Sequence, residues 1–372
     1  GGTSGIGAEV AHSLATRGAQ LILLVPHPLT DPFLADYISD LRVSTKNSLI
    51  TAEHVDLASL HSIRAFATRW LDNAPPRRLD MVVLCAGTTA TAGLETGDPD
   101  EGVERVWMVN YLANFHLLGL LSPALRAQPP DRDVRVLIAT CASYLGGDLL
   151  HISPPKEQQQ AAASKTKKPN PPDPRPPTMF SPANAYATSK LALTTFAAAY
   201  QKHLVATPRP DSFPPRPRVI VVDPGWCRTP GMRRWLTRGS LWGLAGYVVT
   251  WPVWWLVLKS AGRGAEGFLF AGMEERFGRV VESGASVEMR FVKECKERRV
   301  GREEVVGNEG VQGDLWKWSE GMIVEAEKRG VEGRKRRKME EEEAKEAEEA
   351  GREMDEYREK LGKKRRKGKG GG

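Results

Sequence analysis

The stretch Gly1-Gly2-Thr3-Ser4-Gly5-Ile6-Gly7 decides the fold, because an amphipathic run from Ala8 to Arg17 and an apolar segment from Leu21 to Val25 follow it directly. Glycines let a backbone turn sharply and approach a pyrophosphate, whose charge is favoured at the amino end of the next helix. The glycine spacing alone is also compatible with an ordinary flexible terminus. Its position ahead of a helix and a strand, at the spacing of a β-α-β unit, predicts a nucleotide-binding loop.

A second stretch, Tyr186-Ala187-Thr188-Ser189-Lys190, sets a phenol and an ammonium four residues apart. On a helix these positions share a face, so the two groups can reach one site. A nearby cation favours the phenolate, so we expect Lys190 to lower the pKa of Tyr186 toward the range useful for proton transfer. The same pair also occurs on solvated helix faces, so the surrounding motifs have to decide its role.

Two polar residues lie between these stretches. Asn110 falls within a long, mostly apolar helix that we expect to end near Leu125, and its amide needs a backbone or water partner there. Ser143 comes just after the predicted strand from Val134 to Thr140. Open α/β sheets bind ligands at the carboxyl ends of their strands, although Ser143 could also be a simple turn residue.

In this order the motifs resemble the short-chain dehydrogenase/reductase family, whose loop has the pattern Gly-x-x-x-Gly-Ile-Gly. The resemblance implies an α/β fold with a doubly wound parallel sheet of Rossmann type over residues 1–280. It also implies a catalytic tetrad of Asn110, Ser143, Tyr186 and Lys190. Tyr186 would exchange a proton with the substrate oxygen and Ser143 would hydrogen-bond that oxygen. Lys190 would hold the ribose, and Asn110 would hold a proton-relay water.

The resemblance further implies which residues contact the cofactor. Asp56 would bond the adenine amino group, with capping of the following helix as its alternative role. The turn at Ala86-Gly87 would pass close to the cofactor, although Leu84-Cys85 replaces the two asparagines usual in the family. Thr229 would bond the carboxamide of the nicotinamide. The whole set is Gly1, Thr3, Ser4, Gly5, Ile6, Gly7, Asp56, Ala86, Gly87, Asn110, Tyr186, Lys190, Pro224, Gly225 and Thr229.

The segment Val25-Pro26-His27 bears on the choice of cofactor. An acidic residue at this strand end bonds the ribose of NAD, whereas a basic residue accommodates the phosphate of NADP. The missing carboxylate favours NADP as the cofactor, with NAD possible. The chain also begins at the glycine loop, without a hydrophobic strand before it. We therefore expect a fragment whose sheet lacks its first, central strand.

An uncharged run of 18 residues, 241–258, is rich in tryptophan and contains Pro252, which we expect to break or kink a helix. Its length is at the lower limit for a membrane span, so a re-entrant or surface-lying anchor is favoured over a crossing. A lid over an apolar pocket is the alternative, and both favour a lipophilic substrate. This run is similar to membrane- or lipid-droplet-associated members related to retinol dehydrogenases. We therefore expect a cytosol-facing membrane location, at the endoplasmic reticulum or a lipid droplet.

Two further segments depart from a compact domain. A run rich in Pro, Lys and Gln at 154–177 has too little apolar surface to order itself, so we expect a disordered insertion, or alternatively a stiff proline-rich ligand. Residues 281–372 alternate basic and acidic blocks, which predicts a charged tail that is helical or disordered. The basic blocks suit an anionic membrane surface, while the acidic block and the lack of a base-reading motif disfavour specific nucleic-acid binding.

The four cysteines are widely spaced and form no Cys/His cluster, which argues against a zinc site or a disulfide framework. The sequence thus predicts an NADP(H)-preferring oxidoreductase acting on a lipophilic alcohol, aldehyde or ketone, without a metal. Two alternatives remain at this stage. One is a cofactor-binding protein without turnover, and the other is a membrane-tethered interaction protein.

Overall fold

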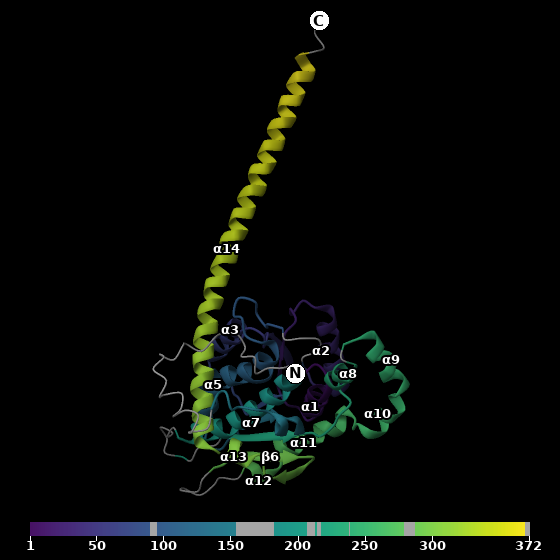
Figure 1. Cartoon of the computed structure of the whole chain (residues 1–372), viewed down its shortest axis with the longest axis vertical. Coiled ribbons are helices and arrows are strands. Elements are labelled where there is room, and N and C mark those ends of the chain that lie inside the picture. Colours follow the sequence, from purple (N-terminus) through teal and green to yellow (C-terminus); the bar gives the residue numbers. More distant parts are fainter. Residues whose placement is uncertain are drawn as a thin grey trace.

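The computed structural model describes residues 1–89, 95–153, 182–206, 213, 217–237, 239–278 and 287–368, so the insertion predicted at 154–177 lies outside the described residues. The elements are α1 (Gly5–Thr16), β1 (Leu21–Val25), α2 (Pro32–Thr45), β2 (Ile50–His54), α3 (Leu60–Leu71), β3 (Met81–Leu84), α4 (Arg105–Trp107), η1 (Met108–Leu112), α5 (Ala113–Arg126), β4 (Arg135–Ala139), η2 (Ala142–Gly146), α7 (Pro182–Ala206), β5 (Arg218–Asp223), α8 (Pro230–Thr237), α9 (Leu241–Val249), α10 (Trp251–Val257), α11 (Ala261–Met273), α12 (Glu275–Gly278), β6 (Arg290–Lys293), β7 (Lys296–Arg298), α13 (Glu303–Val306) and α14 (Glu309–Gly368). A rounded body carries α14, which extends far beyond it, and α8, α9 and α10 form a lobe on the other side (Figure 1).

The main sheet has the strand order β3-β4-β5-β6-β7. Its strands run parallel from β3 to β6, and β7 pairs antiparallel with β6 at the edge. Side chains of β5 alternate between two cores. Val219 and Val221 pack among residues of α5 and α7, whereas Ile220 and Val222 pack among residues of α1 and α11. Helices therefore cover both faces, and the predicted doubly wound α/β fold is confirmed.

The strands β1 and β2 pair with each other in a separate two-stranded sheet. Every residue of β3 is partly exposed, whereas β5 is buried along its whole length. Within the described part of the chain, no strand pairs with both β1 and β3 to join the two sheets. The sheet thus lacks the strand expected ahead of the glycine loop.

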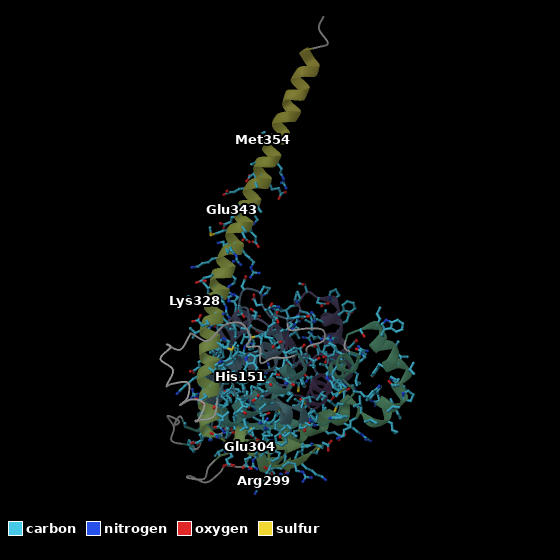
Figure 2. All side chains as sticks on the ribbon, viewed as in Figure 1. His151, Arg299, Glu304, Lys328, Glu343 and Met354 are labelled. Carbon is cyan, nitrogen blue, oxygen red and sulfur yellow. The ribbon has the colours of Figure 1, made fainter. Side chains whose placement is uncertain are left out.

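The boundary expected near residue 280 needs correction, because the folded body continues beyond it. The strand β6 pairs with β5 within the main sheet. The first part of α14 packs against α7 and α3, and it buries Leu315, Ile323 and Ala326 in the larger core. A hydrogen bond of 2.6 Å joins Ser319 of this helix to Tyr111. Only the later part of α14, where Glu343 and Met354 lie, projects as a charged helix (Figure 2).

The uncharged run 241–258 forms two short helices, α9 and α10, that meet at Thr250. Pro252 lies in the first turn of α10, so the predicted break at this proline is confirmed. The Thr250 hydroxyl accepts a hydrogen bond from the indole of Trp254 over 2.7 Å, which holds the junction. Among the residues that the structure describes, no helix is both long and apolar enough to cross a membrane.

The stability of the fold depends on pH through a buried histidine. His116 of α5 lies 3.5 Å from Glu327 without a hydrogen bond, and Glu327 already pairs with Arg64. Burial, assisted by the charge of Arg64, lowers the pKa of His116 from 6.5 to about 4. Because the unfolded chain takes up this proton near pH 6.5, the neutral His116 contributes its full stability above that pH. The contribution is lost as the pH falls toward 4.

We therefore expect His116→Gln to lose less stability than the parent when the pH is lowered from about 7 to about 5. Urea unfolding at both pH values measures the difference. His12→Gln, at an exposed site on α1, is the matched control and should behave as the parent does. Equal pH sensitivity of parent and His116→Gln would contradict this assignment.

Candidate active site

Two glycines of the opening loop, Gly1 and Gly7, pack tightly against neighbouring backbone. A Cβ on Gly1 would lie 2.5 Å from the nitrogen of Ala86, and one on Gly7 would lie 1.9 Å from the Gly1 carbonyl oxygen. Gly5 has a φ of +56°, in the left-handed region that favours glycine, and its Cβ position lies 3.5 Å from Thr229. The loop therefore forms a backbone-lined cradle between the ends of β3 and β5.

The helix α1 begins in this cradle. Its N-cap residue, Ser4, makes no side-chain capping hydrogen bond, and the first turn holds no acidic residue. The positive end of the helix is therefore suited to a phosphate group. Thr3 is partly exposed in the loop, whereas Ile6 faces α11, where it lies 3.0 Å from the Cβ position of Gly264. The loop residues fit a dinucleotide, with Ile6 serving as a packing residue.

The carboxylate of Asp56 accepts a hydrogen bond from the Ala58 N–H over 2.8 Å, just after β2. It does not cap α3. That role belongs to Glu101, whose carboxylate accepts from the N–H groups of Leu60 and His61 over 2.8 and 3.1 Å. The alternative role predicted for Asp56, capping of α3, is therefore filled by Glu101.

The turn after β5 carries the remaining predicted cofactor residues. Gly225 follows Pro224 with a φ of +76°, and its N–H donates to the Asp223 carboxylate over 2.9 Å. Thr229 lies at the start of α8, where its hydroxyl accepts from the Met232 N–H over 3.2 Å. Since Thr229 also lies beside the glycine loop, this turn forms the opposite wall of the cradle.

Asn110 lies in the π-helical turn η1, a type of irregularity frequent at functional sites. Its side chain accepts from the Thr88 N–H over 2.8 Å and donates to the Thr88 carbonyl over 2.9 Å. It also donates to the hydroxyl of Ser189 over 3.1 Å, and the amide of Asn114 donates to its carbonyl over 2.9 Å. The predicted need for polar partners is met, and Asn110 supports the turn after β3.

The ammonium of Lys190 lies on the inner side of α7. It donates to the Ala139 carbonyl over 3.0 Å and lies 5.8 Å from the centroid of the Tyr186 ring. Close to it, a Cβ on Gly87 would lie 3.7 Å from this ammonium and 3.4 Å from the amide oxygen of Asn110. Burial lowers the pKa of Lys190. Tyr186, Lys190, Asn110 and the glycine turn therefore share one site.

Cys141 connects the two catalytic hydroxyls predicted from the sequence. Its thiol donates to the hydroxyl oxygen of Tyr186 over 3.4 Å and shares a contact of 2.8 Å with the hydroxyl of Ser143. Ser143 itself lies in the short helical turn η2 directly after β4. The structure thus brings Ser143 and Tyr186 to the same thiol.

The expectation that Lys190 lowers the pKa of Tyr186 is wrong for this structure. Burial raises the pKa of Tyr186 well above its ordinary value, and the neighbouring Cys141 and Asp223 raise it further. Lys190 gives its short hydrogen bond to a backbone carbonyl instead of the phenol. Tyr186 is therefore held as a proton donor, which suits the protonation of a carbonyl oxygen.

Comparison with known proteins shows the family of this chain. A family model described as short chain dehydrogenase matches residues 1–142. The uncharacterized oxidoreductase pbr1 of Schizosaccharomyces pombe is 38% identical over 332 residues, which cover 88% of this chain and 81% of that protein. The chain belongs to the short-chain dehydrogenase family. As a member of that family, it is an NAD(P)-dependent dehydrogenase/reductase.

Other relatives agree with this assignment. The uncharacterized oxidoreductase YNL181W of Saccharomyces cerevisiae is 33% identical over 344 residues, covering 88% of this chain and 79% of that protein. Human retinol dehydrogenase 13 is 28% identical over 276 residues, covering 74% of this chain and 71% of that protein. The predicted similarity to retinol-dehydrogenase-like members of the short-chain dehydrogenase family is confirmed.

Sequence reasoning missed two polar neighbours of this short-chain dehydrogenase site. Cys141 was considered only for metal or disulfide chemistry, although its place two residues before Ser143 at a strand end was visible in the sequence. Asp223 directly precedes the predicted cofactor residues Pro224 and Gly225, but nothing in the sequence indicates that its buried carboxylate acts on Tyr186. Cys141 follows β4 and Asp223 ends β5, and these two strands are parallel neighbours in the sheet.

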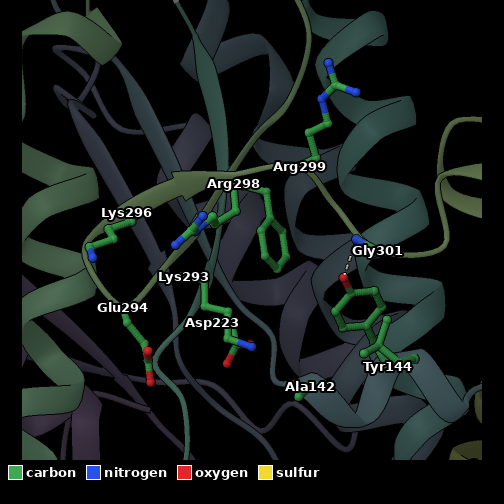
Figure 3. A pocket seen from close by; sticks show the side chains of 11 residues that line it. Ala142, Tyr144, Asp223, Lys293, Glu294, Lys296, Arg298, Arg299 and Gly301 are labelled. Carbon is green, nitrogen blue, oxygen red and sulfur yellow. Dashed lines mark hydrogen bonds and ion pairs between the residues drawn. The ribbon is translucent and has the colours of Figure 1, made fainter.

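A cavity of about 570 Å³ opens next to Ser143, between η2, the end of β5 and the β6-β7 hairpin (Figure 3). Its charged lining consists of Asp223, Glu294, Lys293, Lys296, Arg298 and Arg299. The N–H of Gly301 donates to the Tyr144 hydroxyl over 2.7 Å at its rim, which fixes the residue after Ser143. The basic groups outnumber the acidic ones, so the cavity suits a polar or anionic group.

The thiol of Cys141 offers a direct test of this site. Because Cys141 raises the pKa of Tyr186, we expect Cys141→Ala to lower it. Alcohol oxidation needs the phenolate of Tyr186, so its rate increases as the pH rises. In Cys141→Ala this increase should occur at lower pH. The pH dependence of kcat for alcohol oxidation measures the shift. Cys295→Ala, at a cysteine outside the site, is the control, and a profile unchanged in Cys141→Ala would contradict the contact.

Proposed function

We propose that this chain is an NADP(H)-preferring oxidoreductase that acts on a lipophilic alcohol, aldehyde or ketone. One observation carries the proposal: the buried phenol of Tyr186 and the hydroxyl of Ser143 meet at one thiol. Lys190 lies behind the phenol, and the glycine cradle lies beside it. A proton donor, a hydroxyl for the substrate oxygen and a dinucleotide cradle are the parts that carbonyl reduction needs.

In the proposed mechanism the protein places the substrate and moves the proton. The bound nicotinamide supplies or accepts the hydride. Ser143 holds the substrate oxygen, and Tyr186 donates its proton to that oxygen in reduction or withdraws one in oxidation. Lys190 holds the ribose, and Asn110 keeps the turn at Thr88 in place. We further propose that Asn110 holds the relay water through which the proton is replaced.

The preference for NADP is supported by the end of β1. Residues 25–27 contain no carboxylate to bond a ribose hydroxyl. The nearest acid downstream, Asp31, is engaged elsewhere, because its carboxylate caps α2 by accepting from the Phe33 N–H over 2.9 Å. This argues for NADP over NAD.

The lipophilic substrate and the membrane location are supported by two features. Retinol dehydrogenase 13, whose name states an apolar substrate, is a relative, and the helices α9 and α10 present exposed apolar side chains. We therefore place the enzyme at a cytosol-facing membrane, the endoplasmic reticulum or a lipid droplet. The charged cavity beside Ser143 would then take the polar end of an amphiphilic substrate.

The test is the consumption of NADPH and of NADH over a panel of long-chain aldehydes and ketones. We expect oxidation that depends on the carbonyl compound and is faster with NADPH. Cofactor binding without carbonyl-dependent oxidation would favour a binding protein without turnover. Equal rates with NADPH and NADH would overturn the preference for NADP but not the proposed reaction.

A further inference from the structure

The lobe formed by α9 and α10 exposes an apolar surface of unusual density. No described residue of either helix is buried. Its large apolar side chains that are more than half exposed include Leu241, Trp242, Val249, Trp255 and Leu256, and Trp235 of α8 is also exposed. Many exposed large apolar side chains on one pair of helices mark an interaction site, because apolar residues that are exposed singly do not gather in this way.

The charged residues of the segment that contains this lobe have a single sign. Between Pro224 and Ala265 the sequence contains six Lys or Arg residues and no Asp or Glu. Arg233 and Arg234 are exposed on α8, at one end of the uncharged run, and Arg263 is exposed beyond its other end. Exposed cations at both ends of an uncharged apolar run complement an anionic lipid surface.

The lobe is firmly tied to the body at its base. The Arg228 N–H donates to the Lys259 carbonyl over 2.7 Å, and the Lys259 N–H donates to the Trp226 carbonyl over 2.9 Å. The guanidinium of Arg228 lies 5.4 Å from the centroid of the Trp255 ring, and Lys259 pairs with Glu294. The exposed surface is therefore held in a fixed orientation relative to the active site.

The dimensions of the lobe suit insertion into one leaflet. The helix α9 has 9 residues and α10 has 7, so at about 1.5 Å per residue each extends only a fraction of the roughly 30 Å of a hydrocarbon core. Tryptophans such as Trp242, Trp251 and Trp255 prefer the boundary between headgroups and acyl chains. A lid closed over the site would instead bury these side chains against the body.

We propose that the α8-α10 lobe, residues 230–257, docks the enzyme onto an anionic membrane surface. Its apolar hairpin enters the outer part of one leaflet, while the flanking arginines contact the headgroups. The lobe leaves the body directly after Thr229, which lies against the glycine loop. Docking therefore holds the catalytic site close to the lipid from which an apolar substrate would come. This step deepens the proposed function by naming the surface and the lipid class it selects.

The first test is co-sedimentation of the full chain with phosphatidylcholine vesicles that contain phosphatidylserine, compared with vesicles of phosphatidylcholine alone. We expect stronger binding to the anionic vesicles, and a loss of binding of at least about tenfold in the double variant Trp242→Glu/Leu256→Glu. The control Phe33→Glu/Val43→Glu changes two residues of α2 that are 84% and 75% exposed, against 89% and 81% for Trp242 and Leu256. It should bind as the parent does.

The cations are tested separately. Arg233→Glu/Arg234→Glu should lose the preference for anionic vesicles by at least about tenfold, whereas Lys328→Glu/Lys345→Glu on α14 should keep it. Equal binding to both vesicle types, or equal losses in a test variant and its control, would overturn the proposal. So would sedimentation of the lipid-free chain as a dimer that Trp242→Glu/Leu256→Glu dissociates, since a second copy would then cover the lobe. The vesicle assay contains no substrate. A failure of this assay would therefore not count against the proposed carbonyl reduction, which is tested separately.

Discussion

Tyr186→Phe should lower kcat for carbonyl reduction by about 10² to 10⁴, because the phenol is the group that can protonate the substrate oxygen. The benzene ring remains, so the packing of α7 should change little. The variant loses the hydrogen bond from the Cys141 thiol and nothing else that the structure records for this hydroxyl. Steady-state consumption of NADPH with a saturating carbonyl substrate measures the effect.

The matched control for this variant is Tyr200→Phe. Tyr200 lies on the same helix, α7, and its hydroxyl is engaged with Ser122 and the Leu118 carbonyl, away from the site. Tyr200→Phe should keep the parent kcat, although it removes a buried hydrogen bond. NADPH affinity, measured by fluorescence titration, should stay near the parent value in Tyr186→Phe. Equal kcat in Tyr186→Phe and the parent would remove Tyr186 from the mechanism.

Leu315→Ala should lower the free energy of unfolding by about 2–5 kcal/mol, because it opens a cavity in the main core. Leu315 is 2% exposed on the first part of α14, within a core shared with α5 and α7. Met339→Ala on the projecting part of the same helix is the control. Met339 is 61% exposed, so its substitution should change stability by no more than about 0.5 kcal/mol.

Truncation separates the two parts of α14 in the same way. A chain ending after Lys338 should melt near the parent temperature, since every later residue of the helix whose burial the structure describes is exposed. A chain ending before Asn308 loses Leu315, Ser319 and Ile323 from the core and should not fold stably. Circular dichroism during heating compares the three chains. Equal melting of both truncated chains with the parent would show that α14 is dispensable for folding.

The order of elements could be predicted because local patterns decide them. The strands predicted from Leu21 to Val25 and from Val134 to Thr140 appear within one residue of the expected positions. Apolar runs bounded by glycine or polar turns fix such elements without reference to the rest of the chain. The break before Pro252 was predictable for the same reason, since proline cannot donate the hydrogen bond that a continuous helix needs.

The role of the segment after residue 280 could not be predicted from its pattern. Apolar residues such as Leu315 and Ile323 are few among the charged residues of this segment. The sequence pattern therefore indicates a solvated helix over most of its length. Its partners, among them Trp107 and Tyr111, lie some two hundred residues earlier in the chain. Only the fold brings the two together, because burial there depends on contacts distant in sequence.

The pKa of Tyr186 shows a similar limit at the site. Spacing predicts that Lys190 shares a face with Tyr186, and the structure places the ammonium 5.8 Å from the ring centroid. Spacing does not report burial, nor the proximity of Cys141 and Asp223 from other strands. These three effects raise the pKa, and they outweigh the influence expected of the cation.

The most direct measurement is the fate of deuterium from NADPH labelled at the hydride-donating carbon. With a long-chain aldehyde or ketone as substrate, we expect mass spectrometry to find one deuterium at the carbinol carbon of the alcohol product. The amount of labelled alcohol should fall by at least about a hundredfold when Tyr186→Phe replaces the parent over the same reaction time. A labelled cofactor that binds the parent enzyme but passes no deuterium to any carbonyl substrate would contradict the proposed reaction.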